Sequence, residues 1–157
     1  MYRTRSAAAA LLAAALLLIP AEASTASTPS TDEVQNRINQ VLAEFPGGVQ
    51  TATNEVTWGN GELILTVADP SGAAAMSVGS CTTGAHCVYD GSNLAGSKLT
   101  FTSCTTQSVG PLGAPVRSIA NARTSAVVRA YSDLGAVGSV SANSWINTTW
   151  AMTKIGC

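Results

Sequence analysis

Two segments of the chain share one spacing of residue types, and this repeat constrains the fold more than any other feature. Tyr89 is followed five positions later by the apolar Leu94 and two further on by Gly96, and the same spacing recurs 42 positions later from Tyr131 to Gly138. The spacing is typical of a tight folded hairpin, in which the ring covers the turn and the glycine has a positive φ or meets a neighbouring backbone. Two such hairpins, packed face to face, predict a Greek-key sandwich.

The N-terminal segment has the features of a cleaved signal peptide. Arg3 and Arg5 precede an unbroken apolar run from Ala7 to Ile19, and the small residues Ala21 and Ala23 follow Pro20. The run is too short to span a bilayer. We therefore expect a secreted, extracellular protein, with a signal peptide over 1–23, a flexible mature N-terminus over 24–29, a helix and hairpin over 30–69, a linker over 70–80 and a disulfide-stapled domain over 81–157.

The composition of the secreted part excludes several partners. Removal of residues 1–23 takes away two of the eight Lys and Arg residues and one of the nine Asp and Glu residues, which leaves a small negative net charge without basic clusters. Such a surface disfavours nucleic-acid binding and electrostatic membrane association. We expect a monomer that is not bound to a membrane.

All four cysteines lie in the second half of the chain. An even number in an exported protein indicates disulfides, and four cysteines allow three pairings. The spacing favours a local loop between Cys81 and Cys87 and a bond from Cys104 to Cys157 at the C-terminus. From Cys81 onward, short β-prone stretches alternate with Gly, Ser and Asn turns, which predicts a mainly β domain.

The first half of the mature chain predicts one helix and one hairpin. Ser30 and Glu33 fit a capping box, and apolar residues recur at helical spacing until the stretch from Pro46 to Gly48 ends the pattern. The stretches 49–58 and 63–67 read as strands around the turn 59–61. A two-stranded ribbon is marginal alone, so this unit needs a packing partner.

The cysteine and glycine spacings also resemble a known family. The pattern Cys81-x2-Gly84-x2-Cys87-x-Tyr89-x4-Leu94-x-Gly96, followed by Leu99-x-Phe101-x2-Cys104 and by the stretch 116–121, resembles secreted actinobacterial peptidase inhibitors of the Streptomyces metalloproteinase inhibitor type. The repeat resembles the βγ-crystallin signature. The resemblance implies a βγ-crystallin-like Greek-key sandwich after the helix and hairpin, and a secreted protease inhibitor or protease-binding module with metalloproteases as candidate targets.

An inhibitor presents a rigid loop to the protease, and three segments are candidates for it: the loop 81–87, the turn 90–95 and the stiff segment 108–115. The sequence contains no Gly-x-Ser-x-Gly, His-Glu-x-x-His or phosphate-loop motif. The single histidine, His86, lies inside the short cysteine loop, where a packing or surface role is expected. We therefore expect no catalytic residue and no enzyme.

Two alternative functions remain open. The stretch 120–125 resembles the calcium loops of crystallin-like folds, so calcium is the one cofactor considered, and its oxygen ligands would come from Asp90, Asn121, Thr124, Ser125 and Asp133. Trp145 and Trp150 would instead suit a carbohydrate-binding platform. Either alternative describes an extracellular or envelope module without inhibitory activity, and a small secreted effector is a second alternative.

Overall fold

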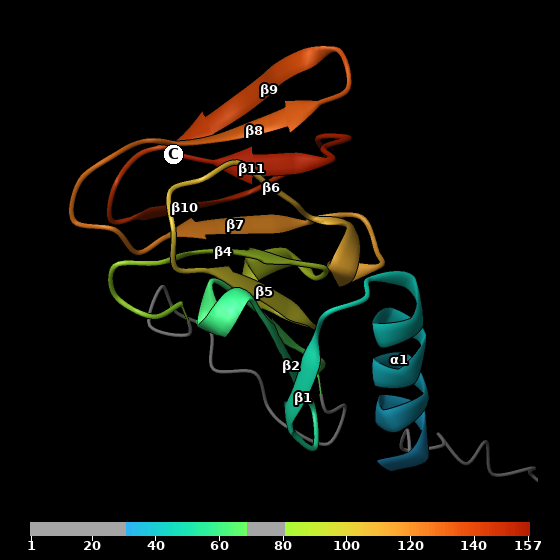
Figure 1. Ribbon diagram of the computed structural model, residues 1–157. Helices are drawn as coiled ribbons and strands as arrows, with labels where there is room; N and C mark the ends of the chain where they lie inside the picture. The colour runs from blue at the N-terminus through green and yellow to red at the C-terminus, as the bar shows by residue number, and fades with distance from the viewer. Residues whose placement is uncertain (1–30, 69–80) are drawn as a thin grey trace, which may run out of the picture.

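The computed structural model describes residues 31–68 and 81–157, and it confirms a mainly β fold with two antiparallel sheets and one helix (Figure 1). The predicted signal peptide, the predicted mature N-terminus 24–29, the predicted capping residue Ser30 and the linker 70–80 lie outside the described residues. No helix within the described ranges is long and apolar enough to cross a membrane.

The larger sheet has seven strands in the order β1-β2-β3-β5-β4-β7-β10, and the smaller has four in the order β6-β11-β8-β9. The bounds in the larger sheet are β1 Val49–Ala52, β2 Glu55–Trp58, β3 Leu63–Thr66, β5 Lys98–Phe101, β4 His86–Tyr89, β7 Ser118–Asn121 and β10 Ser144–Asn147. Those in the smaller sheet are β6 Gln107–Ser108, β11 Lys154–Gly156, β8 Val128–Ser132 and β9 Gly135–Val140.

The two sheets exchange one strand each. The strands β4, β5, β6 and β7 follow one another in the chain, yet β6 lies in the smaller sheet beside β11. Reciprocally, β10 leaves the run of β8, β9 and β11 and pairs with β7 in the larger sheet. Because each half contributes a strand to the sheet of the other, neither four-strand half can form its sheet alone. The crystallin-like assignment of this arrangement stays a prediction.

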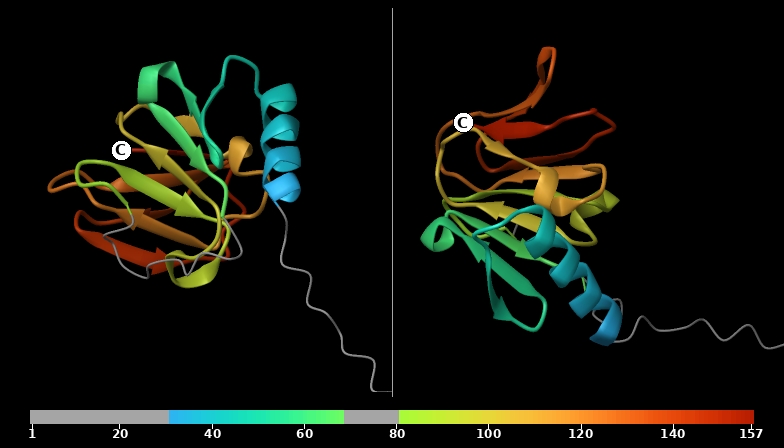
Figure 2. Two further views of the ribbon diagram at one scale, coloured as in Figure 1. Left: turned by 90° about the horizontal axis from the view of Figure 1, so that it is seen from below. Right: turned by 45° about the vertical axis from the view of Figure 1, so that its right-hand side comes forward.

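The helix α1 spans Thr31–Glu44 and confirms the predicted helix. It ends before Pro46, and its residues Ile38 and Val41 are buried. Figures 1 and 2 show α1 alongside the end of the larger sheet that holds β1 and β2. The helix therefore covers strands that the smaller sheet does not reach.

The predicted strand over 49–58 is divided in two. The chain turns back at Thr53 and Asn54, and β1 pairs with β2 to form an additional hairpin. Asn54 favours this turn because its side-chain Nδ2 donates to the carbonyl of Val67 over 3.0 Å, while its own carbonyl accepts from the amide of Val67 over 2.8 Å. The predicted turn between β2 and β3 is present, with Asn60 at a φ of 55°.

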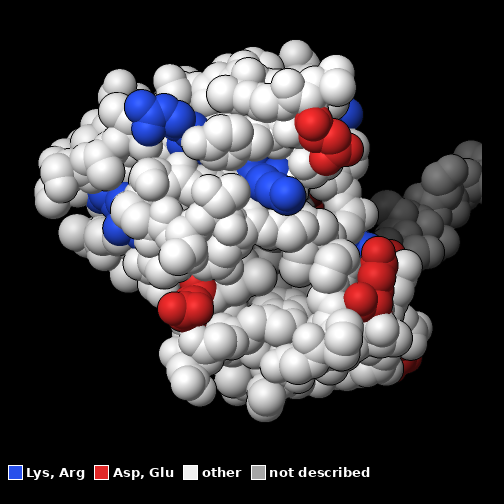
Figure 3. All heavy atoms as spheres, turned by 45° about the horizontal axis from the view of Figure 1, so that its top comes forward, with Lys and Arg blue, Asp and Glu red and all other residues white. Residues whose placement is uncertain are grey.

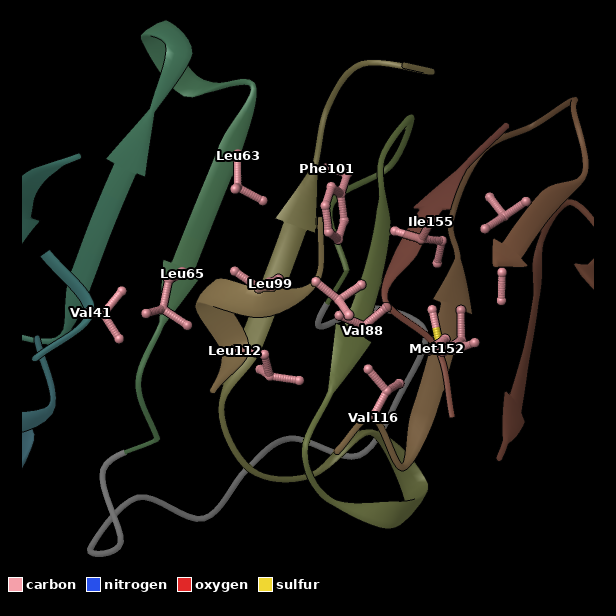
Figure 4. Packing of buried hydrophobic residues seen from close by; sticks show 14 of the residues in the cluster. Val41, Leu63, Leu65, Val88, Leu99, Phe101, Leu112, Val116, Met152 and Ile155 are labelled. Atoms are coloured by element: carbon pink, nitrogen blue, oxygen red, sulfur yellow. The ribbon is translucent and has the colours of Figure 1, made fainter. Parts of the chain in front are cut away.

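The hairpin continues the sheet of the C-terminal half, because β3 pairs with β5 through Leu65 opposite Leu99. One hydrophobic core therefore joins the helix, the hairpin and both sheets (Figure 4). The residues labelled in that view include Val41 of α1, Leu65 of β3, Val88 of β4 and Ile155 of β11. A smaller buried cluster lies on Cys87 and Tyr89, whose side chains alternate with that of Val88 along β4.

Both disulfides favoured by the spacing are present, Cys81–Cys87 and Cys104–Cys157. The first bond belongs to the smaller buried cluster. The second bond holds the end of the chain, where the amide of Cys157 also donates to the carbonyl of Cys104 over 3.3 Å. All four cysteines are therefore structural, and no free cysteine is present among the described residues.

Candidate functional site

The turn of the first repeat is a closed, hydrogen-bonded structure. The buried Oγ of Ser118 donates to the carbonyl of Gly91 over 2.7 Å and accepts from the amide of Leu94 over 3.0 Å. Asp90 Oδ1 accepts from the amide of Ser97 over 2.8 Å. Leu94 is buried, and Gly96 has a φ of 83° in a place where a Cβ would overlap the Asp90 carboxylate. This turn is consequently held by internal hydrogen bonds and anchored by Leu94, while Ser92 and Asn93 stay exposed.

The second repeat forms a different structure from the same spacing. Ser132 pairs with Gly135, so Asp133 and Leu134 alone connect β8 to β9. The glycine of the motif, Gly138, is needed for close approach, because a Cβ at this position would lie within the ring of Trp150. Trp150 therefore packs directly against the backbone of β9 and supports the hairpin from one side.

The tip of the β8–β9 hairpin presents a single apolar side chain to solvent. Leu134 is 100% exposed. The Ser132 Oγ accepts from the Leu134 amide over 3.2 Å, and Asp133 Oδ1 accepts from the Thr153 hydroxyl over 3.0 Å. Figures 1 and 2 show this hairpin projecting at the end of the molecule away from β1 and β2. The fold thus holds an exposed leucine at the tip of a braced projection.

A groove of about 720 Å³ lies beneath this tip. The hairpin contributes Leu134 and Val137, and the segment before β11 contributes Trp150 and Met152. The lining is mostly apolar. The exposed tip and the groove together form a mostly apolar surface, which we call the hairpin-tip surface.

The three segments predicted as contact loops each combine exposed residues with residues that are anchored in the fold. In the cysteine loop, Ala85 and His86 are buried beside the two cysteines. In the segment 108–115, Val109 and Leu112 are buried, and Arg37 of α1 donates a hydrogen bond to the Leu112 carbonyl. In the turn 90–95, Asn93 is exposed, but its amide donates to Asn147 Oδ1 over 2.7 Å. All three segments thus take part in the packing of the fold.

The candidate calcium ligands are spread over the fold. In the pairing of β4 with β7, Asn121 lies opposite His86 and Ser118 lies opposite Tyr89, so Asp90 and Asn121 are at opposite ends of the strand pair. The remaining candidates are placed separately: Thr124 and Ser125 follow Asn121 in the loop before β8, and Asp133 lies at the hairpin tip. No group of three His, Cys, Asp or Glu side chains suited to a metal occurs in the described parts of the chain. Calcium binding stays a prediction.

Asn121 uses its side chain to join the two sheets. It is fully buried, and its Nδ2 donates to the carbonyls of Ala126 and Val140 over 3.1 and 3.0 Å. Its Oδ1 accepts from the amide of Arg123 over 3.2 Å. The Asn121 side chain is therefore engaged in structural hydrogen bonds at both of its polar atoms.

His86 packs in the interior next to Asn121. Its ring is fully buried and stacks on Phe101 with 5.0 Å between ring centroids and 8° between planes. Nδ1 accepts from Arg123 Nε over 3.4 Å, whereas Nε2 has no hydrogen-bond partner among the described residues. Burial, and secondarily the positive charge of Arg123, lowers the pKa of His86 to about 4. Its buried ring agrees with the predicted packing role.

Three residues that shape these sites were not singled out from the sequence in these roles: Ser118, Arg123 and Leu134. Ser118 and Arg123 act through partners distant in the chain, so local spacing carried no signal for them. Leu134 offered one signal, because an apolar residue stands alone in the polar turn Ser-Asp-Leu-Gly. On the face shown in Figure 3, charged side chains are scattered over a mostly uncharged surface, so charge does not mark the site.

One of three comparisons with known proteins finds a similarity, and it covers the middle and later part of the chain. No curated protein and no solved structure matches the chain. Residues 74–143 match the model of peptidase inhibitor family I36. The matched range includes the first repeat, the first disulfide and the β8–β9 hairpin. The match over residues 74–143 agrees with the family resemblance of the motifs and supports a protease-inhibitor role.

Proposed function

We propose that the protein is a secreted, non-catalytic inhibitor of extracellular proteases and that it contacts its target through the hairpin-tip surface. The family match supports the inhibitory role. The observation that carries the contact site is the complete exposure of Leu134 at the tip of a braced hairpin. The two disulfides fit an extracellular location.

The hairpin has the physical properties that a contact element needs. A protease cleft binds an extended, projecting segment, and binding is tighter when the segment is ordered beforehand. Trp150 against Gly138 and the Asp133–Thr153 hydrogen bond both restrict the tip. Leu134 makes no burial contribution to folding, so its whole side chain is available to a partner. Burial of the Leu134 side chain in an apolar pocket of the protease would contribute about 1.5–3 kcal/mol to binding.

Catalysis by this chain is disfavoured by the position of its single histidine. The His86 ring is fully buried, so it cannot reach a substrate bound at the surface. A nucleophile and a general base must lie within hydrogen-bond reach of each other and of the substrate. The protein therefore acts by occupying a protease cleft, with metalloproteases as the target class that the family resemblance implies and a monomer as the acting form.

Titration of the oxidised chain from Ser24 to Cys157 against a thermolysin-like metalloprotease and a subtilisin-like serine protease tests the function. We expect stoichiometric inhibition of one class. Leu134→Asp should weaken inhibition by about 10- to 150-fold, the equivalent of the lost burial. The matched control is Val49→Asp, because Val49 is 64% exposed but lies on β1, far from the hairpin.

The outcomes separate the two parts of the proposal. Absence of inhibition of both proteases at micromolar protein would contradict the inhibitory function. Inhibition that Leu134→Asp leaves unchanged, with both variants melting at the same temperature as the parent, would place the contact elsewhere on the molecule.

A further inference from the structure

A second groove, distinct from the hairpin-tip surface, lies where the end of α1 meets the β2–β3 turn. It has a volume of about 370 Å³. The two aromatic residues of its lining are Phe45 and Trp58, and the prolines Pro46 and Pro111 also line it. Cavities of this size hold a side chain or a small ligand. We call this cavity the α1-hairpin groove.

The aromatic walls of the α1-hairpin groove are held in place by the backbone. Trp58 Nε1 donates to the carbonyl of Phe45 over 3.0 Å, and a Cβ at Gly48 would lie 2.6 Å from the indole ring. A Cβ at Gly110 would lie 2.9 Å from the ring of Phe45. Because both rings pack against glycine backbones, they form the groove before any ligand arrives, which reduces the ordering cost of binding.

The charged residues that line the groove are all acidic. Glu44 at the end of α1 and Glu62 after the turn both line it, and none of its described lining residues is Lys, Arg or His. The Glu62 carboxylate is positioned beside the turn, because a Cβ at Gly59 would lie 3.1 Å from Glu62 Oε2. Lys154 pairs in register with Ser108 of the lining but does not itself line the groove. An apolar, aromatic cavity with acidic residues in its lining matches an apolar chain that ends in a cation.

We propose that the α1-hairpin groove binds a basic side chain, lysine or arginine, of a protein partner. The aliphatic part of that side chain lies along the rings of Phe45 and Trp58, and its cationic end lies near the carboxylates of Glu44 and Glu62. Aromatic faces attract such cations, and the carboxylates add charge complementarity. The groove shares no lining residue with the hairpin-tip surface, so this inference stands independently of protease inhibition.

The test uses the oxidised chain from Ser24 to Cys157, labelled with ¹⁵N. The chain has three tryptophans, and Trp58→Phe assigns the indole N–H resonance of Trp58. N-acetyl-lysine methylamide and N-acetyl-arginine methylamide are titrated against N-acetyl-norleucine methylamide, which has the apolar chain without the charge. We expect the Trp58 resonance to shift with millimolar affinity for the basic compounds, and norleucine to bind at least about fivefold more weakly.

Two variants separate charge from shape. Glu44→Gln with Glu62→Gln keeps the volume of both side chains and should remove the preference for the basic compounds. Glu33→Gln is the matched control, because Glu33 lies in the first turn of the same helix and does not line this groove. Equal binding of norleucine, an unchanged preference in the double variant, or no Trp58 shift at tens of millimolar ligand would each overturn the proposal. A Trp58 shift that depends on protein concentration alone would also overturn it, since the occupant would then be a second copy.

Discussion

Acidification from pH 7 to pH 4 is expected to destabilise the protein through His86. The ring lies fully buried against Phe101, and its Nε2 has no hydrogen-bond partner in the described part of the structure. A proton on this ring would place a positive charge in the interior beside Arg123. Burial first, and then the Arg123 charge, lowers the pKa of His86 to about 4 from the ordinary histidine value of 6.5.

The sign and size of the effect follow from proton linkage. Because the folded pKa is below the unfolded one, the unfolded chain binds the proton first as the pH falls. The stability contributed by neutral His86 is complete above pH 6.5 and is lost between pH 6.5 and about pH 4. A shift of this size corresponds to about 3 kcal/mol between pH 7 and pH 4. That is a large fraction of the 5–15 kcal/mol typical of a folded domain.

Asp90 changes the stability of the fold with pH in the opposite direction, so its contribution must be separated from that of His86. Burial raises the pKa of Asp90, although its hydrogen bonds with Ser97 reduce the rise. A carboxyl with a raised folded pKa favours folding as the pH falls. The total pH dependence therefore mixes both groups, and only a comparison with a variant that lacks the imidazole isolates His86.

Urea unfolding of the parent and of His86→Phe at pH 7, 6, 5 and 4 provides that comparison. Phenylalanine keeps the stacking on Phe101 but does not titrate. The difference in unfolding free energy between parent and variant should fall by about 3 kcal/mol over this range. A difference independent of pH would refute the reasoning. Because the chain has one histidine, its NMR titration gives the pKa directly, and a folded-state value near 6.5 would refute it as well.

Three further predictions concern the framework of the fold. Gly138→Ala should cost about 1–3 kcal/mol, because the added Cβ must displace the Trp150 ring, and thermal melting together with protease titration measures both stability and the position of the hairpin. Replacement of Cys104 and Cys157 by alanine should cost about 4 kcal/mol in urea unfolding, because the bond closes a loop with a sequence separation of 53. Asn121→Ala should lower the melting temperature equally in calcium and in chelator, because its amide bridges the two sheets; a calcium-dependent rise that the variant abolishes would instead support the predicted calcium site.

The part of the fold predicted from the sequence rests on local interactions. The helix followed from apolar residues spaced for one face and from Pro46, which cannot continue it. The turn between β2 and β3 followed from glycines and Asn60, which tolerate a positive φ. The preferred cysteine pairing followed from the shortness of the loop from Cys81 to Cys87. Each of these signals is contained in a few consecutive residues.

The candidate site depended on contacts between distant residues. The spacing repeated at Tyr89 and Tyr131 led to a closed turn in the first case and an open hairpin in the second. Ser118 closes the first turn through Gly91 and Leu94, 27 and 24 positions away, whereas Asp133 and Leu134 alone make the second turn. The same motif therefore did not predict which turn would project from the surface.

The sequence alone determined that the chain forms short strands around two disulfides and carries the pattern of an inhibitor family, because these properties depend on residue type and spacing. Tertiary structure decided that β3 pairs with β5, that His86 is buried against Phe101 and that Leu134 is exposed. Strand pairing and burial depend on which segments meet after the chain has folded. Apolar residues in short strands leave many such arrangements open, and the packing of the whole core selects one of them.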